Sequence, residues 1–210
     1  MSKLPKINEL NTYHFITTKV WQNIWLLKEE KYCQIIIDNL NFYRKKFSFK
    51  LIAYAIMPWH LHLILMLSRK FNDISKVMQD FKSHTAKEIS SYQKTGRRKP
   101  SLSPYSQAAS EGSPLPGVRN NAESKGTLLP ASYRWVDKGN VHTPCINRIW
   151  QRNFYDFNIY SYEKLEQKVD YINNNAVKHG LVSDPVEYKY SSARNYYFND
   201  QSIIKIDELD

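Results

Sequence analysis

The spacing of apolar residues in the N-terminal part of the chain predicts alternating strands and helices. Three segments have the β-branched, aromatic and aliphatic composition of strands: residues 12–21, 48–57 and 60–67. Two segments repeat apolar residues three and four positions apart, as amphipathic helices do: residues 29–46 and 73–92. Met57-Pro58-Trp59 breaks the second strand, and the short connection to the third predicts a hairpin.

Regular structure is predicted again from residue 148 onward. Residues 148–160 predict a fourth strand, and residues 162–176 predict a helix that Gly180 follows as a stop signal. A short helix over residues 191–198 and a short strand over residues 202–206 complete the chain. The order strand, helix, strand, strand, helix, strand predicts an α+β fold, the ferredoxin-like βαββαβ sandwich, with a tyrosine-bearing helix appended near the C-terminus.

The region between the two halves has a different composition. Residues 95–145 are dense in Ser, Pro, Gly and Asn and show little periodicity, which predicts a long, partly flexible insertion. We therefore expect residues 8–94 and 146–198 to form one domain. Residues 199–210 are expected to be a C-terminal tail.

Charge and aromatic content favour a nucleic-acid partner. The net charge is +10 and the pI is about 9.4, and the chain holds 15 Tyr, 9 Phe and 5 Trp. Single-stranded nucleic acid is held by this combination, because cations bind phosphates while rings stack on bases. The alternative is that the rings fill a core and the basic surface is simply solvated.

Other features narrow the setting. Cys33 and Cys145 make no disulfide framework, and no cysteine pair has zinc-finger spacing. The N-terminus lacks the apolar segment of a signal peptide, and no apolar run approaches the roughly 20 residues of a membrane span. We expect a cytoplasmic protein with no membrane partner.

Two histidines are the first candidates for chemistry. His60 and His62 lie two positions apart on a predicted strand, so both side chains point to the same face of the sheet. Neutral imidazoles in that arrangement can hold one divalent ion, and oxygen donors from elsewhere would suit Mg²⁺ or Mn²⁺. The alternative is a pair of hydrogen-bonded sheet histidines.

The helix predicted over residues 162–176 carries the second candidate. Its apolar stripe consists of Tyr162, Leu165, Val169, Ile172 and Ala176. Tyr171 and Asn175 lie one turn apart on the flank of that stripe, beside Lys168. A tyrosine hydroxyl activated by a metal or a base can act as a nucleophile, although periodicity alone leaves Tyr155 as a rival.

Six short blocks resemble, in this order, segments of the REP-associated tyrosine transposases, which belong to the single-tyrosine HUH (IS200-like) superfamily. The blocks span most of residues 12–197 outside the insertion: YHFITTKVW, MPWHLHLIL, FKSHTAKEI, IWQRNFYD, YINNNAVKHGLV and YKYSSARNY. Two positions depart from the family pattern, since Trp59 stands where Asn is common and Ala176 replaces the usual Pro. Neither change removes a group that the chemistry needs.

The resemblance implies a ferredoxin-like fold and an enzyme that acts on single-stranded or hairpin DNA. Cleavage would leave a 5′-phosphotyrosine and a free 3′-OH. By position, Tyr171 is the implied nucleophile, and His60, His62 and Asn175 are the implied ligands of Mg²⁺ or Mn²⁺. Tyr155 would then belong to the preceding strand.

Further expectations concern DNA contacts and competing functions. Lys82, Lys168 and Arg152 are candidate contacts to DNA, against the alternative of ordinary solvated cations. The principal competing function is a domesticated DNA-binding protein that does not cleave. An RNA-binding sheet is less consistent with the leucines and histidines of HLHLILML, where stacking aromatics would be expected. The sequence is compatible with a monomer or a homodimer.

Overall fold

The structure is a computed structural model that describes residues 13–68, 71–96 and 148–208. Cys145 and nearly all of the predicted insertion lie outside the described residues, so the predictions made for them stay predictions. Within the described part of the chain, no helix is both long enough and apolar enough to cross a lipid bilayer.

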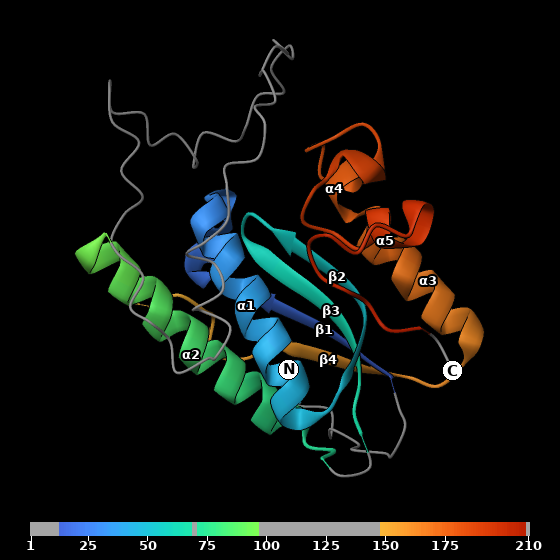
Figure 1. Cartoon of the computed structure of the whole chain (residues 1–210), viewed down its shortest axis with the longest axis horizontal. Helices are drawn as coiled ribbons and strands as arrows, with labels where there is room; N and C mark the ends of the chain where they lie inside the picture. The colour runs from blue at the N-terminus through green and yellow to red at the C-terminus, as the bar shows by residue number, and fades with distance from the viewer. Residues whose placement is uncertain (1–12, 69–70, 97–147, 209–210) are drawn as a thin grey trace.

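A four-stranded antiparallel sheet forms the centre of the molecule (Figure 1). Its strands are β1 (Tyr13–Lys19), β2 (Lys50–Met57), β3 (His60–Met66) and β4 (Tyr155–Ile159). They lie in the order β2-β3-β1-β4, and every neighbouring pair is antiparallel. With the intervening helices, this arrangement confirms the predicted ferredoxin-like topology.

Helices cover both faces of the sheet. Helices α1 (Glu30–Phe47) and α2 (Ile74–Thr95) lie on one face, while α3 (Tyr162–Asn173) lies on the other (Figure 1). We call these the α1/α2 face and the α3 face. Two short helices follow α3: α4 (Asn175–Lys178) and α5 (Ala193–Phe198).

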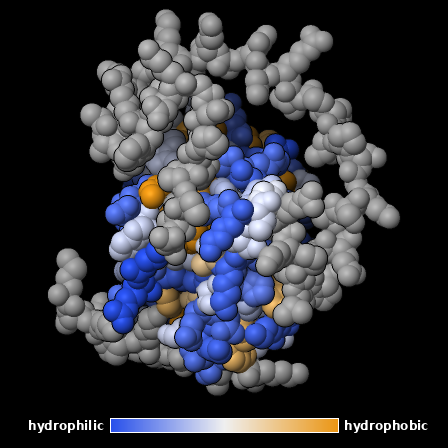
Figure 2. All heavy atoms as spheres, turned by 90° about the vertical axis from the view of Figure 1, so that its left-hand side faces the viewer, coloured by the Kyte–Doolittle hydropathy of each residue, from blue (hydrophilic) through white to orange (hydrophobic). Residues whose placement is uncertain are grey.

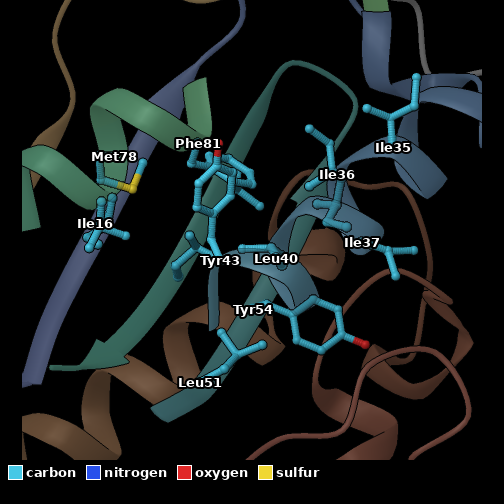
Figure 3. Packing of buried hydrophobic residues seen from close by; sticks show 14 of the residues in the cluster. Ile16, Ile35, Ile36, Ile37, Leu40, Tyr43, Leu51, Tyr54, Met78 and Phe81 are labelled. Atoms are coloured by element: carbon cyan, nitrogen blue, oxygen red, sulfur yellow. The ribbon is translucent and has the colours of Figure 1, made fainter. Parts of the chain in front are cut away.

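The larger core lies between the sheet and the α1/α2 layer. Figure 3 shows Tyr43 of α1 and Phe81 of α2 directed toward one another, and their ring centroids are 6.3 Å apart. Leu61, Leu63 and Leu65 of β3 point into this core. Strand alternation therefore turns the intervening residues of β3 toward α3.

The outer surface on the α2 side is polar. Figure 2 shows hydrophilic side chains over most of the visible described surface there, with only scattered hydrophobic residues. This distribution is expected of an amphipathic helix with one buried stripe. Asp73 caps the start of α2 by accepting a hydrogen bond from the Lys76 amide, and Gly96 ends it with a φ of 63°.

The prediction of a fourth strand from residue 148 is wrong in its first half, because β4 begins only at Tyr155. Before it, Trp150 makes a single isolated bridge to Val20. The following carbonyls of residues 151–153 accept hydrogen bonds from the Lys82 ammonium. The Gln151 amide also donates to the Lys19 carbonyl at 2.9 Å, so pairing with the end of β1 is limited to the residues around this bridge.

The predicted helix over residues 162–176 is interrupted. Asn174 has φ −86° and ψ 2°, which ends α3 at Asn173 and starts α4 at Asn175. Tyr162 is also not part of the buried stripe, because it is the first residue of α3 and is 65% exposed. The stripe that reaches the sheet is shorter: Leu165, Val169, Ile172 and Ala176.

The strand predicted over residues 202–206 is absent from the described C-terminal region, where no regular element follows α5. The tail instead lies along the edge of β2. The amide of Asp207 donates to the Leu51 carbonyl at 2.8 Å, and its carboxylate accepts from the Leu51 amide at 2.8 Å. Asp207 therefore satisfies both the carbonyl and the amide of Leu51 on this edge strand without a further paired strand.

Candidate active site on the α3 face

Strand β3 presents both histidines to the α3 face. His60 and His62 are each 4% exposed, and their ring centroids are 4.5 Å apart. In the sheet register, His62 lies between Thr17 of β1 and Ala55 of β2. The same-face prediction for the two rings is confirmed.

The end of α3 and the start of α4 bring Tyr171 and Asn175 over this pair. The Tyr171 ring meets the His62 ring edge-on, with centroids 5.4 Å apart. Asn175 is fully buried, and its Oδ1 lies 3.1 Å from Nε2 of His60. Residues that are more than a hundred positions apart in sequence therefore meet in one site.

The donor atoms at this site suit a divalent ion. An octahedral ion with ligands at about 2.1 Å holds neighbouring donors about 3.0 Å apart, close to the 3.1 Å between His60 Nε2 and Asn175 Oδ1. Nδ1 of His60 and Nδ2 of Asn175 are buried without a hydrogen-bond partner. The two residues that meet here therefore each keep one buried polar atom that the protein itself does not satisfy.

A neighbouring hydroxyl fixes the second imidazole. Nδ1 of His62 shares a 2.7 Å hydrogen bond with Oγ1 of Thr17, which leaves Nε2 as the remaining nitrogen for a ligand. Outer contacts of this kind orient metal-binding histidines. No cluster of three or more His, Cys, Asp or Glu side chains occurs among the described residues, so an ion held by these histidines would depend on the Asn175 oxygen.

Burial keeps both rings neutral. It lowers the pKa of His60 to about 4 and the pKa of His62 to about 3, and the neighbouring His60 ring adds to the effect on His62. At neutral pH both imidazoles therefore have free lone pairs. Metal binding requires that state.

Tyr171 is partly buried between aromatic rings and lysines. Phe15 meets its ring edge-on at 5.8 Å. The ammonium groups of Lys178 and Lys168 lie 5.0 Å and 5.9 Å from the centre of the ring. The pKa of Lys168 is lowered, mainly by burial and then by nearby Lys164. The hydroxyl-bearing ring thus sits in a positively charged setting.

Tyr155 occupies a different position. It is 54% exposed on edge strand β4, and its ring contacts Phe15 at 6.3 Å. Phe15 in turn stacks on His62 at 5.5 Å. Tyr155 therefore lies one ring farther from the histidine pair than Tyr171 does.

The predicted DNA contacts fall into two places, because Lys82 and Arg152 are neighbours and Lys168 lies apart from them. Lys168 lies at the site, with its ammonium 4.5 Å from the centre of the Phe15 ring. Lys82 belongs to α2, on the α1/α2 face, and its ammonium donates to the carbonyls of Gln151 at 2.7 Å and Asn153 at 3.0 Å. Arg152 is exposed beside Lys82.

Comparison with known proteins finds one matching family model and similar solved structures. Residues 9–104 match the family model of the IS200-like transposases. The fold resembles a REP-associated tyrosine transposase bound to a REP hairpin, with a TM-score of 0.61 and 17% sequence identity over 100% of this chain and 92% of that one. The family match therefore includes His60 and His62, whereas Tyr171 and Asn175 lie outside it. A sequence comparison with curated proteins returns no match.

A second solved structure is less similar to this chain. It is a protein of Deinococcus radiodurans R1 described as a candidate transposase, with 17% identity and a TM-score of 0.34. The alignment covers 52% of this chain and 92% of that one.

Sequence reasoning missed several neighbours of the site. Thr17 could have been found, because it lies on the first predicted strand in the same alternation as Phe15. Lys178 lies seven residues after Tyr171, about two helical turns along, but it falls beyond residue 176, where the predicted helix ends. The approach of His179 to His60, with centroids 5.7 Å apart, had no local signal because it depends on the turn after α4.

Proposed function

We propose that this chain cleaves and rejoins DNA strands with Tyr171 as the covalent nucleophile. The observation that carries the proposal is the convergence of Tyr171 and Asn175 on the buried histidine pair. The match of residues 9–104 to the IS200-like transposase model is consistent with strand transfer. His60, His62 and Asn175 would hold one Mg²⁺ or Mn²⁺.

Single-stranded or hairpin DNA is the proposed substrate. The solved relative is described as bound to a REP hairpin, and a net charge of +10 suits a polyanion. The site also offers cations beside aromatic rings, a combination that suits an unpaired strand. All four proposed active-site residues come from one chain, so a single protomer would carry a complete site.

In the proposed reaction, the Tyr171 hydroxyl oxygen attacks the scissile phosphorus. A bond forms between the phosphorus and the tyrosine oxygen while the bond to the 3′-oxygen breaks. The phenolic proton is lost to solvent, and the departing 3′-oxygen takes up a proton to become a 3′-OH. The bound ion would supply positive charge that offsets the charge developing on the phosphate.

Rejoining is the reverse of this step. A 3′-OH attacks the phosphotyrosine, releases the Tyr171 oxygen and restores a phosphodiester, so no external energy source is needed. The ammonium groups of Lys168 and Lys178 both lie near the Tyr171 ring and would contact the phosphate. Partial burial of Lys168 strengthens such contacts relative to fully solvated lysines.

The proposal is tested by cleavage of labelled single-stranded hairpin oligonucleotides taken from the flanks of the gene. With Mn²⁺ or Mg²⁺, wild-type protein should give a covalent protein–DNA band on a denaturing gel. Tyr171→Phe should bind the DNA with nearly unchanged affinity but give no band, while Tyr155→Phe, the matched control, should still give it. Binding by wild-type protein with no covalent band on any flank would instead support a DNA-binding protein that does not cleave.

A further inference from the structure

A group of aromatic rings lies directly beside the histidine pair. Trp59 precedes His60 in the turn between β2 and β3, and the two ring centroids are 5.2 Å apart. Trp25 stacks on Trp59 at 5.1 Å with an interplanar angle of 23°. His179 meets Trp59 edge-on, at 5.0 Å and 86°. We call Trp25 and Trp59 the tryptophan pair.

These rings are not part of a closed core. Trp25 and Trp59 are both partly exposed, and His179 is exposed. A large apolar side chain usually gains stability from full burial. Two stacked tryptophans that stay only partly buried beside a buried polar site therefore indicate a binding surface.

Backbone contacts fix the tryptophan pair in place. The amide of Leu27 donates to the Pro58 carbonyl, and the amide of Val20 donates to the Trp59 carbonyl, both at 2.9 Å. These bonds tie the loop that carries Trp25 to the turn that carries Trp59. The two rings are thus presented together by a rigid support.

The loop that presents Trp25 also has strained backbone. Gln22 and Asn23 have φ values of 55° and 54°, in the left-handed region that non-glycine residues seldom adopt. Oδ1 of Asn23 is buried with no hydrogen-bond partner. Strain held in a surface loop next to a reactive site is typical of ligand-binding segments.

Two lysines flank the residues that contact the tryptophan pair. Lys19 is exposed at the end of β1 and is the register partner of His60. Lys178 is exposed and immediately precedes His179. Cations that can hold a phosphate backbone next to rings that can stack on a base form the usual surface for single-stranded DNA.

We propose that the tryptophan pair, with His179 at its edge, is a stacking site for one unpaired nucleobase. The base would belong to a nucleotide next to the phosphate held at the histidine pair, since the Trp59 ring contacts the His60 ring directly. This inference rests on the proposed function, because it assumes a DNA strand at that site. Stacking uses the flat face that every base has, so the site would position the strand without selecting a sequence.

Binding measured without metal tests the site separately from cleavage. The probes are a labelled oligonucleotide of about ten thymidines and a strand of equal length and charge made of abasic nucleotides, both in EDTA. Trp59→Leu keeps apolar bulk but removes the aromatic face. It should weaken binding of the thymidine probe about 5- to 150-fold, the range for loss of one stacked base, and should leave abasic binding unchanged.

Two controls make the result specific. Trp59→Phe keeps a stacking face and should retain most of the thymidine affinity, which excludes general misfolding. Tyr197→Leu removes a 60% exposed ring on α5 and should bind both probes as wild type does. Equal affinity of Trp59→Leu and wild type for the thymidine probe would overturn the proposal, as would an equal loss on both probes.

Failure of this site and failure of the proposed enzyme give different results. If Trp59→Leu binds thymidine as wild type does while wild type still forms the covalent band, only the stacking site is refuted. If the stacking loss is seen but no covalent band forms under any condition, the stacking site stands and the cleavage proposal fails.

Discussion

Replacing Lys82 by Met tests whether this lysine stabilises the fold. Lys82 belongs to α2, and its ammonium donates to three consecutive carbonyls, those of Gln151 at 2.7 Å, Arg152 at 3.3 Å and Asn153 at 3.0 Å. The segment it holds leads into β4, whose pairing with β1 forms one edge of the sheet. Met keeps most of the length of the side chain and removes every donor.

The loss can be worked from these contacts. A hydrogen bond to a charged group contributes about 1.5–3 kcal/mol. The carbonyls of Arg152 and Asn153 lie at exposed residues and can bind water instead, so their share is reduced. We expect Lys82→Met to lower the free energy of unfolding by about 2–4 kcal/mol, and the melting temperature by about 4–16 °C for a chain of this size.

Thermal unfolding followed by circular dichroism measures this effect. Lys76→Met is the matched control, since Lys76 lies on the same helix and pairs with Asp80 at 2.7 Å on the surface. An exposed pair of that kind contributes no more than about 1 kcal/mol. Equal melting temperatures for the two variants would refute the structural role of Lys82. A DNA-binding salt slope reduced by about 1 would show that Lys82 also contacts a phosphate.

Three further predictions concern the site. Thr17→Val should weaken Mn²⁺ binding about 10- to 100-fold in calorimetry because the hydrogen bond that orients His62 is lost, whereas Thr95→Val at the exposed end of α2 should not. Metal-free protein should lose stability as the pH falls from about 6.5 toward 4. In the unfolded chain His60 and His62 take up protons near pH 6.5, whereas burial in the fold lowers their pKa values to about 4 and 3. A free energy of unfolding that stays constant over that pH range would contradict this. DNA affinity should fall steeply with salt, in proportion to the phosphates contacted, and a flat response would exclude a DNA ligand.

Much of the fold was predictable because its signals are local. The strands of the first half coincide with apolar segments, and α1 and α2 follow the spacing of their buried residues. Strand alternation alone placed His60 and His62 on one face. The spacing of Tyr171 and Asn175 placed them together, and the family resemblance was needed to bring the two pairs to one site.

The remaining features depend on contacts between distant parts of the chain. The segment before β4 contacts Lys82, which lies about seventy positions earlier in sequence. The C-terminal tail forms no strand because the backbone and carboxylate of Asp207 both bind Leu51. No pattern within either segment encodes such pairings. The tryptophan pair likewise arises from a turn and a loop that only the fold brings together.

The central claim is that Tyr171 forms the covalent bond to DNA, and peptide mapping of the protein–DNA adduct tests it most directly. Wild-type protein would be reacted with hairpin DNA and Mn²⁺, digested with nuclease and trypsin, and analysed by mass spectrometry. We predict a nucleotide attached to the peptide that contains Tyr171, with no modification at Tyr155. An adduct at Tyr155 or at any other residue would contradict the assignment.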